Sequence, residues 1–195
     1  MSQTDPESAR LSSCGKAFHT MMWGFLFFLP LPVPVFDALG WAILLAGLGR
    51  LPGAHPGLAR LRALSGIGIA VWIVRVAALA SPLPGLEKLH VGLYLATWAV
   101  MAIFARQLGS LIAELADELK ADSVAAAARR QRWIPVLPFL AITAGAIIPP
   151  QPSFVAFALA MAVLVAVVWM LMGLMATAAR TCALAERMRA APPTQ

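Results

Sequence analysis

Apolar residues dominate this chain in five long stretches that more polar connections separate. The stretches cover about residues 18–48, 63–80, 89–107, 133–148 and 154–178. A helix needs roughly 17–25 apolar residues to cross the hydrocarbon core of a bilayer, and the last four stretches are close to that length. The pattern predicts an all-α fold, an integral membrane helical bundle with four full spans and a first segment of another kind.

Composition agrees with a membrane protein. Hydrophobic residues make up 61% of the 195 residues and charged residues 12%, with a mean hydropathy of +0.81. Soluble domains carry about 25% charged residues, so this chain has too few charges to cover a soluble globule of its size. The same apolar content excludes disorder, and the presence of only two cysteines excludes a disulfide scaffold.

The first stretch, residues 18–48, is interrupted by Pro30, Pro32 and Pro34. Prolines at every second position remove backbone donors and disfavour helix in the residues before them, so a continuous helix is not expected. The segment is either a broken single span or a re-entrant helical hairpin that leaves the membrane on the side where it entered. Both alternatives predict that it packs inside the bundle, because non-helical backbone at membrane depth needs surrounding protein or water.

Basic residues are placed asymmetrically between the apolar stretches. One set of connections and the C-terminal tail hold Arg50, Arg60, Arg62, Arg106, Lys120, Arg129, Arg130, Arg132, Arg180, Arg187 and Arg189, whereas the other connections hold Lys88. Because cytoplasmic loops are rich in Lys and Arg, this predicts a cytoplasmic C-terminus in a bacterial inner membrane. The N-terminus is cytoplasmic if residues 18–48 re-enter and external if they span. Orientation and contact with the lipid bilayer explain the net charge of +6, and no nucleic-acid-binding motif accompanies it.

The apolar residues change their spacing between residues 108 and 131. A stripe recurs there at helical spacing and consists of Leu111, Ile112, Leu115 and Leu119. This predicts a cytoplasmic amphipathic helix that continues the third apolar stretch. Acidic residues on its other faces would be repelled by anionic headgroups, so the stripe is expected to pack on protein, either another chain or this chain's own cytoplasmic loops.

A polar tail of residues 1–17 and a C-terminal tail of residues 181–195 flank a single transmembrane domain of residues 18–180.

Two charged residues lie well inside the apolar stretches. Asp37 directly follows the proline run, and Arg75 belongs to the second stretch. Charges at membrane depth are costly and indicate a functional site with a partner. Asp37 is expected either to cap the second half-helix or to take part in proton or substrate binding. Arg75 is expected either to extend to the external interface or to form an intramembrane charge pair with Asp37.

The sequence contains no motif for catalysis, for a cofactor or for a metal. His19, His55 and His90 lie in three different segments and lack the spacing of metal or haem ligands. Cys14 and Cys182 have no C-x-x-C partner and are expected to be free thiols near the reducing cytoplasmic face. Glycine-rich phosphate loops and the motifs of rhomboid proteases and phospholipid headgroup transferases are missing too. The chain is therefore not expected to be an enzyme.

The run FDALGWAILLAGL, residues 36–48, resembles a segment of small, mostly uncharacterised bacterial multi-pass membrane proteins. In those proteins an F-D-x-L…G-[WY] run follows an aromatic-rich first stretch. This chain lacks the Pro-Asp that they often carry inside the motif. The resemblance implies a small bacterial membrane protein and implies no activity.

Two functions of different classes fit these observations. The favoured one is a non-catalytic accessory, assembly or scaffold subunit that binds a protein partner or a second copy of itself through helix packing and the cytoplasmic stripe. Small residues at four-residue spacing, at Gly66/Ala70 and at Ala158/Ala162/Ala166, permit close helix approach within or between chains. The alternative is a small transporter or pore in which the broken first segment, Asp37 and Arg75 line a path. A solute path usually needs more polar residues than these, which favours the first function.

Overall fold

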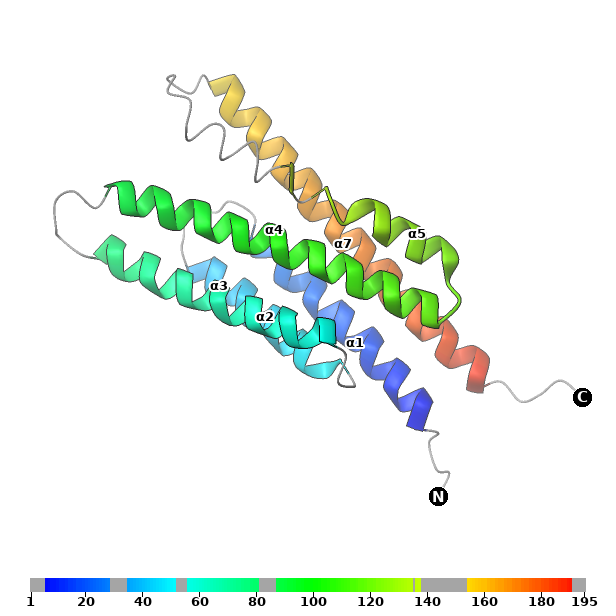
Figure 1. Cartoon of the computed structure of the whole chain (residues 1–195). Helices are drawn as coiled ribbons and strands as arrows, with labels where there is room; N and C mark the ends of the chain where they lie inside the picture. Colours follow the sequence, from blue (N-terminus) through cyan, green and yellow to red (C-terminus); the bar gives the residue numbers. More distant parts are fainter. Residues whose placement is uncertain are drawn as a thin grey trace, which may run out of the picture.

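The computed structural model describes residues 6–28, 35–51, 56–80, 87–134, 136–137 and 154–190. The helices are α1 (Pro6–Leu26), α2 (Val35–Arg50), α3 (Pro56–Ala80), α4 (Glu87–Glu118), α5 (Asp122–Gln131) and α7 (Phe154–Ala190). No strand occurs in these residues, so the predicted all-α class is confirmed. Figure 1 shows an elongated bundle in which the long helices lie along one common direction.

Three helices are long and apolar enough to cross a membrane. The candidate spans are Gly57–Ala80 in α3, Val91–Glu118 in α4 and Val165–Glu186 in α7. They overlap the second, third and fifth apolar stretches and confirm the prediction of a membrane protein. The fourth predicted span, residues 133–148, lies outside the described residues except at positions 133, 134, 136 and 137.

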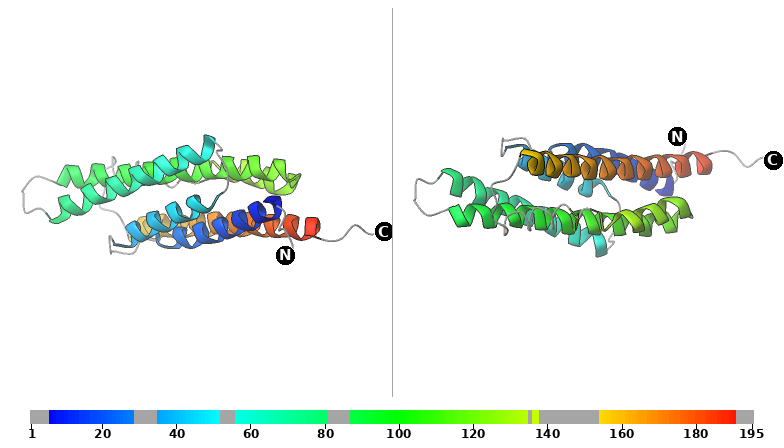
Figure 2. Two further views of the ribbon diagram at one scale, coloured as in Figure 1. Left: turned by 90° about the horizontal axis from the view of Figure 1, so that it is seen from below. Right: turned by 90° about the horizontal axis from the view of Figure 1, so that it is seen from above.

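The helices form two layers, which the turned views of Figure 2 separate. One layer contains α3, α4 and α5, and the other contains α2, α1 and α7. Within the layers α3 packs on α4, α4 on α5, and α1 on both α2 and α7. The two ends of the chain lie at the same end of the bundle (Figure 1), so α1 and α7 run antiparallel. This arrangement brings the beginning of the sequence into contact with its last helix.

Helix α1 begins at Pro6 and includes most of the residues predicted as a polar N-terminal tail. The helix is amphipathic: its buried positions are Leu11, Cys14, Ala17, Phe18, Met21 and Phe25, three or four residues apart. Arg10 and Lys16 lie on the exposed face. The polar residues of this segment therefore cover the outer face of a helix whose inner face packs on α7 and α2. Helix α7 likewise continues to Ala190, through the first residues of the predicted C-terminal tail.

The indole of Trp41 on α2 occupies the space between the two layers and is fully buried. Its ring meets Phe28 edge-on at a centroid distance of 5.1 Å and Phe104 of α4 at 5.6 Å. On α3 the facing residue is Gly68, where an added Cβ would overlap the indole. Residues from three helices and the turn after α1 thus meet at one indole, and aromatic pairs in this geometry add to the apolar burial.

The predicted single amphipathic helix over residues 108–131 is wrong, because the chain reverses in its middle. Helix α4 ends at Glu118, and Lys120 has a positive φ of 55°. The amide of Ala121 donates to the carbonyl of Ala116 at 2.8 Å, and that of Lys120 donates to Asp117 at 3.0 Å. These two bonds form a Schellman motif, which ends a helix and usually places glycine at the left-handed position. Here a lysine occupies it, so the sequence pattern gave no indication of the stop.

Helix α5 then folds back along α4. Gly109 permits this contact, since a Cβ there would be 3.0 Å from the Cβ of Arg132. Helix α4 continues through this glycine without interruption. Asp117 of α4 and Arg129 of α5 form an exposed ion pair across the two helices. The end of α4 and all of α5 are therefore an antiparallel helix pair at one end of the bundle.

We predict that Lys120→Gly raises the free energy of unfolding by about 1 kcal/mol, because glycine adopts the left-handed conformation without the Cβ penalty. Thermal melting of the protein in detergent would measure the gain as a higher melting temperature. Lys120→Ala is the matched control, since it removes the same charge and keeps the Cβ. Equal melting temperatures for the two variants would contradict the prediction.

Candidate functional site

The structure brings Asp37 and Arg75 together. Nη1 of Arg75 donates a hydrogen bond to Oδ2 of Asp37 at 3.1 Å, and the two side chains form an ion pair. The side chain of Arg75 is 22% exposed and that of Asp37 is 24% exposed within the isolated chain. Two alternatives were open for Arg75, and the structure shows the ion pair with Asp37.

Helix geometry explains how Asp37 reaches this position. Helix α2 begins at Val35, directly after the last proline of the run, so Asp37 lies within the first turn and not at the capping position. A carboxylate in the first turn is favourable because the helix dipole is positive there. Its Oδ2 accepts from Arg75 on the neighbouring helix. The predicted capping role is thus replaced by a contact between α2 and α3.

A third side chain completes the site. The guanidinium of Arg75 lies 5.4 Å from the centroid of the Tyr94 ring on α4, a distance at which a cation is attracted to an aromatic face. Tyr94 also meets Trp98 edge-on, with 6.1 Å between the ring centroids. Our sequence reasoning missed Tyr94, although it is the only tyrosine of the chain and lies in an apolar stretch.

The site joins three helices through one guanidinium. Arg75 on α3 binds the carboxylate of α2 and the aromatic ring of α4. Each charge has its counterion at hydrogen-bonding distance, which is the arrangement that lowers the cost of keeping charges out of water. Among the described residues, no group of three or more His, Cys, Asp and Glu side chains could hold a metal ion. The chemistry that these contacts support is electrostatic bracing between helices.

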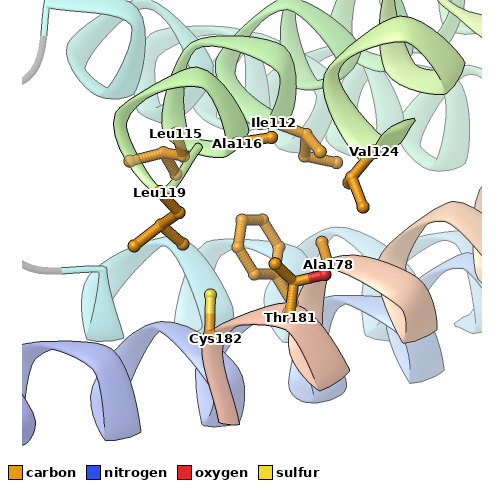
Figure 3. Close-up of a pocket in the computed structure, with 9 residues that line it drawn as sticks. Ile112, Leu115, Ala116, Leu119, Val124, Ala178, Thr181 and Cys182 are labelled. Atoms are coloured by element: carbon orange, nitrogen blue, oxygen red, sulfur yellow. The ribbon is translucent and has the colours of Figure 1, made fainter. Parts of the chain in front are cut away.

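The leucine stripe of the predicted cytoplasmic helix packs on the protein's own chain. Leu111 and Ile112 are buried, and Leu115 and Leu119 pack against the core. Figure 3 shows Ile112, Leu115 and Leu119 facing α7 across a hollow of about 10 Å³. The stripe therefore contacts α7 and not an open surface, because α1, α5 and α7 all gather at this end of α4.

Ala178, Thr181 and Cys182 of α7 line the far side of this hollow (Figure 3). Cys182 forms a hydrogen bond with Cys14 of α1, and both cysteines are buried free thiols. This hydrogen bond lowers the pKa of the Cys14 thiol below its ordinary value, against the opposing effect of burial. Spacing along the sequence could not place the two thiols in contact, because 167 residues separate them.

The histidines do not converge within the described part of the chain. His19 lies exposed on α1, where its Nε2 accepts a hydrogen bond from Nε1 of Trp23 at 3.4 Å. His90 belongs to α4, and His55 lies outside the described residues.

We predict that Asp37→Ala and Arg75→Ala each reduce the stability of the protein in detergent, by about 3–5 kcal/mol if the site is as dry as a protein interior. The double variant should recover part of the loss, because it leaves no uncompensated charge. Melting temperatures of the two single variants and the double variant would measure the coupling.

The exposed pair Asp117–Arg129 offers a matched control on the same chain. Exposed ion pairs contribute about 0–1 kcal/mol, so the corresponding cycle at these positions should give a coupling close to zero. Simple addition of the two losses at Asp37 and Arg75 would contradict the bracing role.

Comparison of the chain with protein-family models, with curated proteins and with solved structures finds no match. The resemblance of residues 36–48 to small bacterial multi-pass proteins therefore stays a prediction. What the protein does must be inferred from its geometry and chemistry.

Proposed function

We propose that this chain is a non-catalytic, multi-pass protein of a bacterial inner membrane that acts as an accessory, assembly or scaffold subunit. The supporting observation is that small residues on two apolar helices are exposed, and that a Cβ added to Gly66 or Gly173 would meet no atom of the described residues within 4 Å. In a bilayer, helices associate through such faces because small side chains let the backbones approach closely. The partner is another membrane helix, from a second copy or from a different protein.

Helix α3 carries the first of these faces. Only 17% of its most apolar window is buried inside the chain, because among the described helices it packs on α2 and α4 alone. Gly66 and Ala70 are exposed, and a Cβ added to Gly66 would meet no atom within 4 Å. Two residues further on, Gly68 faces inward against Trp41. The small residues of α3 thus have two distinct uses, one inside the chain and one on its outer surface.

Helix α7 carries the second face. Ala162, Ala166 and Gly173 are exposed on it, and a Cβ at Gly173 would also meet nothing within 4 Å. Trp169, 75% exposed, lies between these small residues. A large exposed ring flanked by small residues offers a partner helix both a projecting side chain and shallow hollows on either side.

The geometry of α1 and α2 favours the re-entrant orientation for residues 18–48. The rings of Phe27 and Phe36 stack at 6.0 Å across the segment that joins the helices. At the other end, Arg50 donates to Oγ1 of Thr20 at 2.6 Å. A helical hairpin whose two ends lie at the same side of the bundle supports a cytoplasmic N-terminus, beside the cytoplasmic C-terminus that the basic residues predict.

The charge pair bears on the alternative function. A transport path would need the charges of Asp37 and Arg75 to be free to bind a solute, at least in one state. Their direct contact, reinforced by Tyr94, supports a bracing role instead. We therefore favour the subunit over the transporter.

We predict that Gly66→Leu and Gly173→Leu each weaken the association of the protein with a second copy or with its membrane partner and leave its fold intact. The added side chains would meet no neighbouring atom in the isolated chain, but they would keep a partner helix at a greater distance. Cross-linking in native membranes, followed by size-exclusion chromatography in mild detergent, would measure the loss.

Two further glycines serve as references. Gly49→Leu also enters open space, but at the end of α2 and outside both faces, so it should associate as the unaltered protein does. Gly68→Leu should fail to fold, because its side chain would overlap Trp41. If neither Gly66→Leu nor Gly173→Leu differs from Gly49→Leu, the proposed association surfaces are wrong.

A further inference from the structure

Helices α1 and α7 leave an open groove of about 420 Å³ near the two ends of the chain. Its floor is formed by small residues, Gly15 of α1 and Ala179 and Ala183 of α7. The helices approach closely here, since a Cβ on Gly15 would lie 3.5 Å from the carbonyl oxygen of Ala179. The close approach of the two backbones thus fixes the groove, whose lining also includes Leu11 and Ser12 of α1.

Charged side chains form the rim of the groove. Lys16 of α1 and Arg180 of α7 are exposed along it, with Glu186 as the only acidic residue in its lining. Two cations against one carboxylate give the groove a positive potential. An apolar floor below a basic rim fits an amphiphile with an anionic head.

His19 adds a directed donor to this rim. Its Nε2 accepts the hydrogen bond from Trp23, and a neutral imidazole carries a proton on one nitrogen only. The proton of the neutral ring is therefore on Nδ1, which can donate to an anionic oxygen. Trp23 thus orients the imidazole of His19, which belongs to the lining of the groove.

The position of the groove agrees with a membrane interface. Its α7 residues form the last part of the candidate span Val165–Glu186. Trp23, one turn beyond His19, is 49% exposed, and tryptophan is enriched where the bilayer meets water. In the orientation proposed above, this interface belongs to the cytoplasmic leaflet, where basic pockets between helices bind anionic headgroups.

We infer that the α1/α7 groove binds an anionic phospholipid, with Lys16, Arg180 and the Nδ1–H of His19 contacting the headgroup phosphate. The glycerol and the beginning of the acyl chains lie on the small residues of the floor. This binding is separate from the helix faces proposed for partner contact, because none of its residues belongs to them.

The test uses the full-length protein in a neutral detergent, with phosphatidylglycerol, phosphatidylcholine or inorganic phosphate added. Phosphatidylglycerol should raise the melting temperature in a saturable manner, because a ligand that binds only the folded state stabilises it. Phosphatidylcholine and inorganic phosphate should leave it unchanged. Stabilisation by inorganic phosphate alone would overturn the inference in favour of a free-anion site.

Charge-neutral variants then locate the lipid. Lys16→Gln combined with Arg180→Gln should weaken the apparent affinity for phosphatidylglycerol about tenfold or more, since each basic residue near an anionic headgroup adds to binding. Arg60→Gln combined with Arg130→Gln is the matched control: it removes the same charge at exposed positions outside the groove. Equal losses in the two double variants would show general attraction of lipid to a basic surface and would overturn the inference.

A third variant keeps the charges and fills the space. Ala183→Leu places a larger side chain at an exposed position of the floor and should also abolish the stabilisation by phosphatidylglycerol, while the melting temperature without lipid stays the same. An unchanged lipid response in Ala183→Leu would overturn the assignment to this groove even if the charge variants failed to fold.

Discussion

The contact of Trp41 with Gly68 is the constraint on which the two-layer packing depends. The indole fills the space where α2, α3 and α4 and the turn after α1 come closest, and the absence of a side chain on Gly68 lets α3 approach it. Asp37 lies one turn before Trp41 on α2, and Arg75 lies two turns after Gly68 on α3, so the ion pair shares the helix faces of the aromatic contact. The apolar contact of Trp41 with Gly68 and the ion pair thus join α2 and α3 at two positions along their length.

Much of the architecture follows from the sequence because length and hydropathy alone define membrane helices. The second, third and fifth apolar stretches became α3, α4 and α7. The proline run correctly separated two helices, but the contacts of Phe27 with Phe36 and of Arg50 with Thr20 could not be read from it. Pairing of Asp37 with Arg75 could be weighed in advance, since charges in an apolar environment require counterions.

Features that depend on a single backbone angle or on distant contacts could not be predicted. The reversal after α4 rests on a left-handed lysine, where the usual glycine would have marked the stop. The helical spacing of Leu11, Cys14, Phe18 and Met21 continues from the supposed polar tail into the first apolar stretch, but the charged residues of the tail concealed it. The cysteine contact and the lipid groove arise from the packing of α1 on α7, which local patterns do not encode.

The pairing of the first helix with the last also sets an order of assembly. Helices α3, α4 and α5 contact their sequence neighbours and can pack as soon as each leaves the ribosome. Helix α1 can pack on α2 early, but the rest of its apolar face is covered only when α7 has been made. At the usual 5–20 residues per second, roughly 6–26 s pass between the end of α1 at Leu26 and the start of α7 at Phe154. During that interval the hairpin of α1 and α2 is an incomplete unit, because Cys14 and Phe18 of α1 still lack their contacts on α7. Truncation before α7 is therefore expected to leave this surface of the N-terminal hairpin permanently uncovered.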